Sequence, residues 1–251
     1  MTTPLDALRT VALASALVAV AGLGYVASQT VLAAPSYSVA DQQYVGAPAP
    51  AARSQGDVSA GKAVGPRQAD PQWVTDTAAK AGIPAPAVRA YANAQLSEPR
   101  GCQVGWTTLA GIGWVESQHG TIGGRTLGDD GHSSSVILGP ALDGRGKVAA
   151  IPATPETTTW HGDPRWDHAV GPLQFIPSTW ETWGADGDGD GVADPNDLDD
   201  AAYTAARYLC ADGHDLTSGS GWADAIFSYN HAQSYVDSVY AAAESYADRT
   251  G

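Results

Sequence analysis

Hydrophobic positions recur at helical spacing along most of the chain from residue 70 onward. No long stretch alternates hydrophobic and polar residues, so the pattern favours helices over strands. Ser178 and Glu181 stand at the spacing of a capping box that opens a short helix through Trp183. We therefore predict a mainly α fold, with the longer helices at 71–82, 84–95, 107–119, 199–213, 221–230 and 234–249.

Residues 121–170 interrupt this pattern. The stretch is rich in Gly, Pro and Asp and shows few periodic signals. An irregular segment of this length in a compact domain is usually either functional or disordered. We predict a long irregular loop.

The helix expected at 107–119 carries an unusual acid. Leu109, Ile112 and Glu116 stand at i, i+3 and i+7 and share one helix face, and Gly120 follows as a stop signal. A carboxylate on an apolar face has its charged form disfavoured by desolvation. Glu116 is therefore a candidate proton donor, although a surface position is the commoner fate of a Glu.

The N-terminus predicts export. No charged residue occurs between Arg9 and Asp41, and the run between them is strongly apolar. Residues 1–34 are either a cleaved signal peptide, with Val31 and Ala33 near a cleavage site, or a membrane anchor. We expect the protein in the cell envelope or outside the cell.

The remaining chain divides into a linker and one domain. Residues 35–69 are rich in Ala, Pro and Gly and predict a disordered linker, and 70–251 form the folded domain. Cys102 and Cys210 are the two cysteines of the chain. In an oxidising compartment they allow one connectivity, so we predict a disulfide.

Composition narrows the function classes. The chain has 27 acidic and 13 basic residues, a net charge of −14, which argues against a nucleic-acid partner. Its aromatic residues are mostly Trp and Tyr, which suit sugar faces and half-buried cores equally well. The six His residues include no HExxH pattern, so zinc hydrolysis has no support.

Residues 186–197, DGDGDGVADPND, match an EF-hand-like calcium loop. Its five carboxylates would repel one another without a cation. Position 12 is Asp where Glu is usual. We expect one structural Ca²⁺ and no organic cofactor, with the ligands Asp186, Asp188, Asp190, the Val192 carbonyl, Asp194 and Asp197.

Four motifs together point to a family. They are ES at 116–117, GPLQFIPSTW at 171–180, the acidic loop, and SYN at 228–230. In this order the set closely resembles lytic murein transglycosylases of the membrane-bound B type, in an exported form that looks actinobacterial. The resemblance covers most of residues 70–248 and implies a lysozyme-like transglycosylase SLT domain.

The resemblance also implies roles for individual residues. Glu116 would be the sole catalytic acid and base. The residues that would contact or position the sugar are Ser117, Gln174, Phe175, Tyr229 and Asn230.

The implied reaction is non-hydrolytic cleavage of the MurNAc–GlcNAc β-1,4 bond of peptidoglycan, giving 1,6-anhydromuramoyl products. We expect a monomer that acts on glycan strands. One alternative is a hydrolytic muramidase with a second carboxylate. Another is a calcium-stabilised module that binds peptidoglycan without cutting it. Candidates for the second carboxylate are Asp129, Asp130, Asp163 and Asp167.

Overall fold

The computed structural model describes residues 46–47, 49–53, 66–98, 102–145, 149–211 and 213–251. The predicted signal peptide or anchor lies outside these ranges, as do most positions of the predicted linker. Within the described residues, no helix is both long and apolar enough to cross a bilayer.

The predicted mainly α fold is confirmed. Outside the helices, the described residues form only isolated β-bridges. In chain order the helices are α3 (Pro71–Ala81), α4 (Ala85–Ser97), α5 (Trp106–Ser117), the 3₁₀ helix η3 (Ile122–Gly124), α6 (Pro155–His161), α7 (Pro177–Trp183), α8 (Leu198–Ala211), α9 (Gly219–Tyr229) and α10 (Gln233–Thr250).

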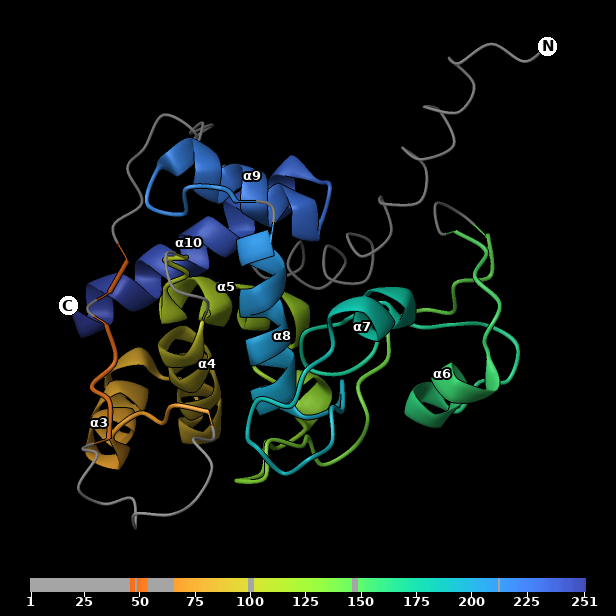
Figure 1. Cartoon of the computed structure of the whole chain (residues 1–251), viewed down its shortest axis with the longest axis horizontal. Coiled ribbons are helices and arrows are strands. Elements are labelled where there is room, and N and C mark those ends of the chain that lie inside the picture. The colour runs from red at the N-terminus through yellow and green to blue at the C-terminus, as the bar shows by residue number, and fades with distance from the viewer. Residues whose placement is uncertain (1–45, 48, 54–65, 99–101, 146–148, 212) are drawn as a thin grey trace.

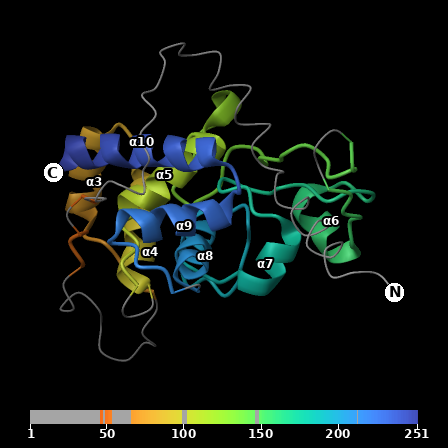
Figure 2. The same cartoon turned by 90° about the horizontal axis from the view of Figure 1, so that it is seen from above.

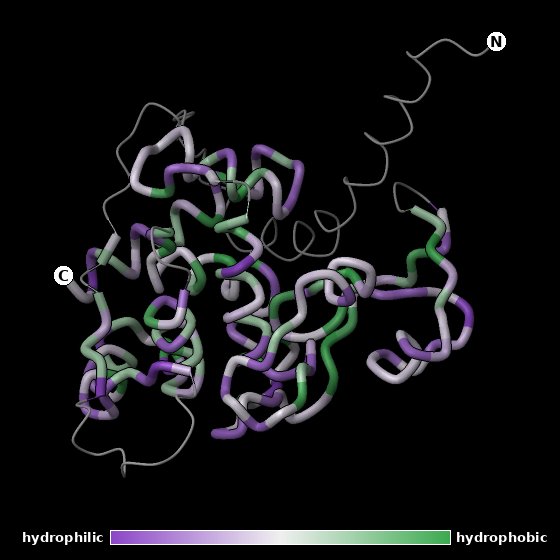
Figure 3. The backbone as a smooth tube through the Cα atoms, viewed as in Figure 1, coloured by the Kyte–Doolittle hydropathy of each residue, from purple (hydrophilic) through white to green (hydrophobic). Residues whose placement is uncertain are grey.

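Helix α5 lies in the middle of the helical body, with α10 packed across it and α4 packed on α8 (Figures 1 and 2). Leu109 and Ile112 of α5 and Leu198 of α8 are fully buried. Hydrophobic and hydrophilic residues alternate along the helices (Figure 3), as expected where each helix buries one face. Helix α5 is the exception, because it is buried along most of its length.

Most helix ends differ from the predicted ones by one or two residues, and two of these differences have a clear local cause. The capping box at Ser178 is not formed: α7 begins at Pro177, with Ile176 as its N-cap. A proline at the first helical position already has the required φ, so the helix starts before Ser178. Helix α5 ends at Ser117, because Gln118 and His119 adopt left-handed φ values of 54° and 60°.

The described residues between 137 and 170, which we call the lobe, contain α6, which the sequence pattern did not reveal. In Figures 1 and 2 the lobe places α6 at the far end of the molecule from the C-terminus. Antiparallel bridges join Leu138 to Val170 and Pro152 to Trp166. Helix α6 has only seven residues and includes three consecutive threonines, too little for a periodic signal.

The interior of the lobe combines a few buried apolar side chains, such as Ile137 and Leu142, with a buried polar network. The buried Asp167 carboxylate accepts a hydrogen bond from Thr157 at 2.6 Å and lies 3.2 Å from His161 Nε2. Thr154 caps α6 through a reciprocal hydrogen bond with Thr157. This network supplies within the lobe what a larger apolar core would otherwise provide.

The end of the predicted linker lies against the helical body. Ala52 and Ala69 form an antiparallel bridge, and the Ala69 amide donates to Asn93 of α4 at 2.8 Å. The described residues at the end of the predicted linker therefore belong to the edge of the folded domain.

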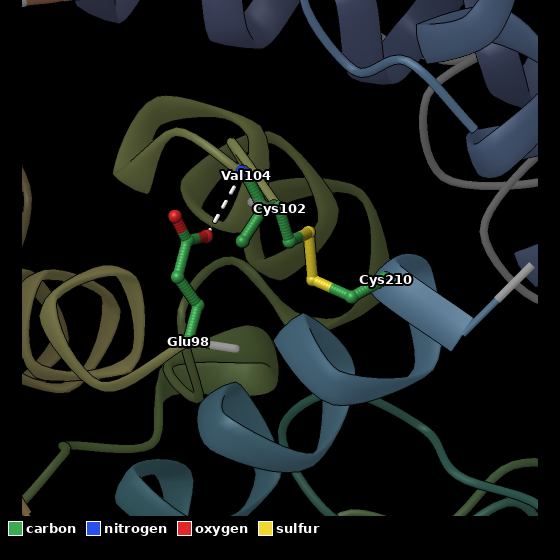
Figure 4. The surroundings of a disulfide bond; sticks show 4 residues. All are labelled: Glu98, Cys102, Val104 and Cys210. Carbon is green, nitrogen blue, oxygen red and sulfur yellow. Dashed lines mark hydrogen bonds between the residues drawn. A yellow bond between two sulfur atoms is a disulfide. The ribbon is translucent and has the colours of Figure 1, made fainter. Parts of the chain in front are cut away.

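The predicted disulfide between Cys102 and Cys210 is confirmed, with a Cα–Cα distance of 5.6 Å. It links the segment before α5 to the last turn of α8 (Figure 4). Beside it, Glu98 accepts a hydrogen bond from the Val104 amide at 3.0 Å. The disulfide thus fastens the approach to α5 onto a neighbouring helix.

Removing the disulfide should destabilise the fold strongly. The bridge closes a loop with a sequence separation of 108 residues. In the chain-entropy model such a loop contributes about 4–5 kcal/mol. We expect the double variant Cys102→Ala/Cys210→Ala to lose about that much unfolding free energy in urea titrations without reductant. Wild-type protein in reductant is the control and should unfold like the variant. Equal stability of oxidised wild type and variant would contradict the prediction.

Candidate functional site

Glu116 lies in the last turn of α5, on the face predicted from its spacing. Leu109 and Ile112 are fully buried, and Glu116 itself is half-buried. The Tyr235 hydroxyl of α10 donates a hydrogen bond of 2.6 Å to Glu116 Oε1. Burial raises the pKa of Glu116 to about 8, against the opposing effect of the Tyr235 hydrogen bond. At neutral pH the carboxyl group is therefore largely protonated.

Sequence reasoning missed Tyr235. Its hydrogen bond to Glu116 joins residues 119 positions apart, a separation that periodicity cannot bridge. The available signal was its place on the apolar face of α10 together with Val239 and Ala243. That signal indicates burial, but it does not identify the partner.

Ser117 connects the end of α5 to the GPLQF segment. It is buried, and its hydroxyl donates to the Pro172 carbonyl at 2.5 Å and accepts from the Gly120 amide at 2.8 Å. The residues after α5 have positive φ values, and the chain there turns so that the Gly120 amide reaches the Ser117 hydroxyl. A role for Ser117 toward the sugar stays a prediction, whereas its structural contacts are evident.

The GPLQF segment forms a tight turn that contacts the end of α5 through the Ser117–Pro172 hydrogen bond. Val170 and Phe175 exchange backbone hydrogen bonds of 2.9 and 3.0 Å. Gly171 has a φ of 79°, and a Cβ there would lie 1.8 Å from the Pro195 carbonyl oxygen. Only glycine fits, because the turn touches the backbone at the end of the acidic loop. Gln174, also with positive φ, donates to the Gly171 carbonyl at 2.8 Å.

Aromatic side chains connect this turn to the carboxyl group. The Tyr229 ring lies 5.7 Å from Phe175 and is stacked on Tyr235 at 6.4 Å. Its hydroxyl donates to the Leu173 carbonyl at 2.9 Å. Burial, and then the nearby Glu116, raise the pKa of Tyr229 well above its usual value. Tyr229 thus lies next to both Phe175 and Tyr235, and Tyr235 in turn binds Glu116, while a role of these residues toward the sugar stays a prediction.

A small pocket of about 50 Å³ opens beside this cluster. It is lined by residues of the turn and of α7, α8 and α9: Gln174, Phe175, Ile176, Thr179, Tyr208 and Tyr229.

Asn230 stands out because its side chain is buried without hydrogen-bond partners. It is 2% exposed, and neither Oδ1 nor Nδ2 is paired with another described group. A buried polar atom left unpaired costs about 1–3 kcal/mol. Such a group is typical of a site that is completed by a ligand or an ordered water.

The acidic loop gathers carboxylates as its spacing predicts. Oxygens of Asp186, Asp188 and Asp190 lie within 4.8 Å of one another. Ca²⁺ binds oxygen ligands at about 2.3–2.6 Å, so such a cluster is spaced to share one ion. Partial burial and the like charges around Asp188 raise the pKa of its carboxyl group. The donor set therefore fits a hard divalent cation.

The structure adds Asp200 to the loop's neighbourhood. Asp200 is buried and accepts hydrogen bonds from the amides of Gly187 at 2.7 Å and Asp194 at 2.8 Å. Burial, and then the like charges of Asp188 and Asp186, raise the pKa of Asp200 to about 6. The residue lies beyond the twelve-residue pattern, so the motif could not indicate it.

The other two predicted side-chain ligands make contacts at the end of the loop. Asp197 accepts from the Asp199 amide at 2.7 Å, and Asp194 lies 3.5 Å from His132 Nε2. Val192 is exposed at the tip of the loop.

A larger cavity of about 480 Å³ lies between α3, α4 and the acidic loop, away from Glu116. Its central cation, Arg89, is already paired with Asp199 at 2.6 Å and donates to the Asp129 carbonyl at 2.7 Å. Although this cavity is larger than the pocket beside Tyr229, its Arg89 is already bound to protein groups, and we do not favour it as the functional site.

Comparison with known proteins adds one finding. Residues 159–226 match the family model of the transglycosylase SLT domain. The match runs from α6 to α9 and includes the 171–175 turn and the acidic loop, while Glu116 and Tyr229 lie outside it. It supports a lytic transglycosylase family, whose substrate is peptidoglycan. No curated protein and no solved structure matches the chain.

The raised pKa of Glu116 predicts a pH-dependent cost to stability. The folded state holds the proton up to a pH of about 8, whereas the unfolded chain releases it near 4.5. Stability is therefore lost as pH rises between these values. We expect Glu116→Gln to be more stable than wild type above pH 7, by about 1 kcal/mol or more, and equally stable below pH 4. Urea titrations across this range measure the difference, with the exposed Glu181→Gln as control. A constant difference at all pH values would contradict the prediction.

Proposed function

We propose that this protein is a lytic transglycosylase that cleaves the MurNAc–GlcNAc β-1,4 bond of peptidoglycan without water. The observation that carries the proposal is the half-buried Glu116, with a pKa of about 8 and a hydrogen bond from Tyr235. Such a carboxyl group holds a proton at neutral pH and can donate it to a glycosidic oxygen.

Glu116 acts twice in this proposal. As an acid it protonates the leaving oxygen of the glycosidic bond while the substrate's own N-acetyl oxygen attacks the anomeric carbon. As a base it then accepts the proton of the muramoyl 6-hydroxyl, which displaces the N-acetyl oxygen and closes the 1,6-anhydro ring. The hydrogen bond from Tyr235 stabilises the carboxylate between the two steps.

The Phe175 and Tyr229 rings and the neighbouring Asn230 offer groups that suit a sugar. The Tyr229 and Phe175 rings offer apolar surface, and the unpaired amide of Asn230 offers both a donor and an acceptor. Binding a sugar hydroxyl or N-acetyl group there would relieve the cost of the unpaired atoms.

Three of the four candidates for a second catalytic carboxylate are engaged in hydrogen bonds elsewhere. Asp167 is buried in the lobe with Thr157 and His161. Asp163 accepts from the Arg165 amide at 2.8 Å, and Asp130 accepts from the His132 amide at 3.2 Å. Each of these carboxylates is thus engaged within its own loop, which supports the single-acid reaction over the hydrolytic muramidase.

We further propose that the acidic loop holds one structural Ca²⁺. Asp186, Asp188 and Asp190 would hold the ion, with Asp200 beside them. The ion would neutralise the clustered negative charge. Because Pro195 at the end of the loop touches Gly171, the loop also supports the turn that carries Gln174.

The reaction predicts distinctive products. Peptidoglycan digested by the purified protein in ¹⁸O-labelled water should yield 1,6-anhydromuramoyl muropeptides without the label, measured by mass spectrometry. Glu116→Gln keeps the size of the side chain but cannot donate the proton. We expect it to lower turnover by about 100-fold or more.

Glu181→Gln, an exposed acid on α7, is the matched control and should retain activity. Reducing-end products carrying ¹⁸O would establish the muramidase instead. Sedimentation with peptidoglycan without any cleavage would favour the binding module.

Calcium removal should destabilise the fold. An ion that binds only the native state raises stability by mass action. We expect a chelator to lower the melting temperature and excess Ca²⁺ to restore it. Asp186→Ala should abolish this response, whereas Asp224→Ala, an exposed acid on α9, should keep it. A melting curve that ignores the chelator would refute the calcium site.

A further inference from the structure

Helix α10 crosses α5 at a point of backbone contact. A Cβ on Gly111 would lie only 2.7 Å from the Val239 carbonyl oxygen. Tyr235, Val239, Ala243 and Tyr246 are buried and follow helical spacing, so they share the face of α10 that meets α5. On this face one tyrosine stands on each side of the crossing.

Both tyrosines make hydrogen bonds to the end of α5. Tyr235 donates to Glu116 at 2.6 Å, and the Tyr246 hydroxyl lies 2.9 Å from His119 Nε2. His119 is 3% exposed, and its amide donates to the Gly113 carbonyl at 2.8 Å, which folds it back along α5. Glu116 and His119 are three residues apart, so one short segment receives both bonds.

The second nitrogen of His119 is bound from a different helix. His119 Nδ1 lies 3.1 Å from the Tyr91 hydroxyl of α4. Tyr91 is fully buried, and a Cβ on Gly113 would overlap its hydroxyl at 2.0 Å. The glycine therefore makes room for this bond. His119 thus connects α4, the end of α5 and α10.

We propose that His119 is a positioning residue for Glu116: through Tyr246 it fixes the angle of α10 across α5, and so holds the Tyr235 hydroxyl against the catalytic carboxyl group. The inference rests on the proposed role of Glu116. It assigns a function to a buried histidine whose two ring nitrogens bind Tyr91 and Tyr246 rather than Glu116.

Tyr235 and Tyr246 lie on opposite sides of the point where α10 crosses α5, so a rotation of α10 about this point moves both hydroxyl groups. Tyr235 lies four residues from Val239, about 6 Å along the helix, and Tyr246 lies seven residues away on the other side, about 10 Å. Gly111 lets the two helices meet closely at this point, against Val239 and Ala243. Without the bond at Tyr246, a rotation of a few degrees about this point moves Tyr235 relative to Glu116.

The histidine and the tyrosines of this network keep their protonation states around neutral pH. Burial, and then the Arg249 cation, lower the pKa of His119 to about 3. The Arg249 guanidinium covers the Tyr246 ring at 4.9 Å. Of the groups that face His119 or Glu116, burial raises the pKa of Tyr91, Tyr229, Tyr235 and Tyr246 above the usual range. Glu116 is therefore the group of this network that titrates near neutral pH.

The test compares tyrosine-to-phenylalanine variants, which remove one hydroxyl and keep the ring. The pKa of Glu116 is measured by ¹³C NMR of its carboxyl carbon, assigned by its loss in Glu116→Gln. Tyr235→Phe should raise this pKa, because the hydrogen bond it removes favours the carboxylate. We expect Tyr246→Phe to raise it as well, and to lower kcat by about tenfold with KM unchanged, because the substrate contacts are intact. His119→Asn, which tolerates a positive φ, should act in the same direction.

Tyr91→Phe is the matched control. It removes an equally buried hydroxyl from the same histidine but does not loosen α10, so the pKa of Glu116 should stay at its wild-type value. In the double variant Tyr235→Phe/Tyr246→Phe, the pKa should equal that of Tyr235→Phe alone.

Two results would overturn the proposal: a wild-type pKa in both Tyr246→Phe and His119→Asn, or equal changes in Tyr91→Phe and Tyr246→Phe. The titration needs no turnover, so it stands even where the products refute the transglycosylase. If wild-type protein does not carry out the reaction but the variants show the expected pKa changes, the proposed function is refuted and the positioning role of His119 stands.

Discussion

The structure depends on the burial of one carboxyl group, Glu116, at the end of the central helix. Desolvation would make a charged group there costly, and the protein resolves this by holding the proton and by supplying Tyr235 as a hydrogen-bond donor. That donor comes from α10, so the hydrogen bond to Glu116 forms only once the last helix has packed across α5. The close crossing at Gly111 is what brings the two helices near enough for the bond.

The 171–175 turn joins this carboxyl group to the acidic loop. Ser117 binds the Pro172 carbonyl, and Gly171 presses against Pro195. The end of α5, the turn and the loop are therefore in continuous contact, although they come from separate parts of the sequence. Electrostatic repulsion within the loop would consequently strain the turn as well as the loop itself.

Much of this arrangement could be anticipated from local patterns. Helical spacing located the main helices and placed Glu116 beside Leu109 and Ile112, and the cysteine count predicted the disulfide that the structure contains. Resemblance to known motifs indicated Phe175 and Tyr229, which do lie together.

What the sequence could not supply were contacts between distant segments. Tyr235 and Asp200 lie outside the motifs, and their partners follow only from the folded structure. Helix α6 was missed because it has seven residues and buries polar side chains, Thr157 and His161, which leave no hydrophobic period in the sequence. The start of α7 was displaced by a proline that fits the first helical position better than Ser178 fits the cap.

The lobe has a consequence for how this domain can diversify. Its buried Asp167, Thr157 and His161 bind one another, and its two ends meet at the Leu138–Val170 bridge beside Gln174. Substitutions or insertions on its outer surface therefore disturb neither the α5–α10 crossing nor the acidic loop. Because surface segments on a fixed scaffold tolerate change, we expect the outer surface of the lobe to accept substitutions with little effect on the contacts of Glu116.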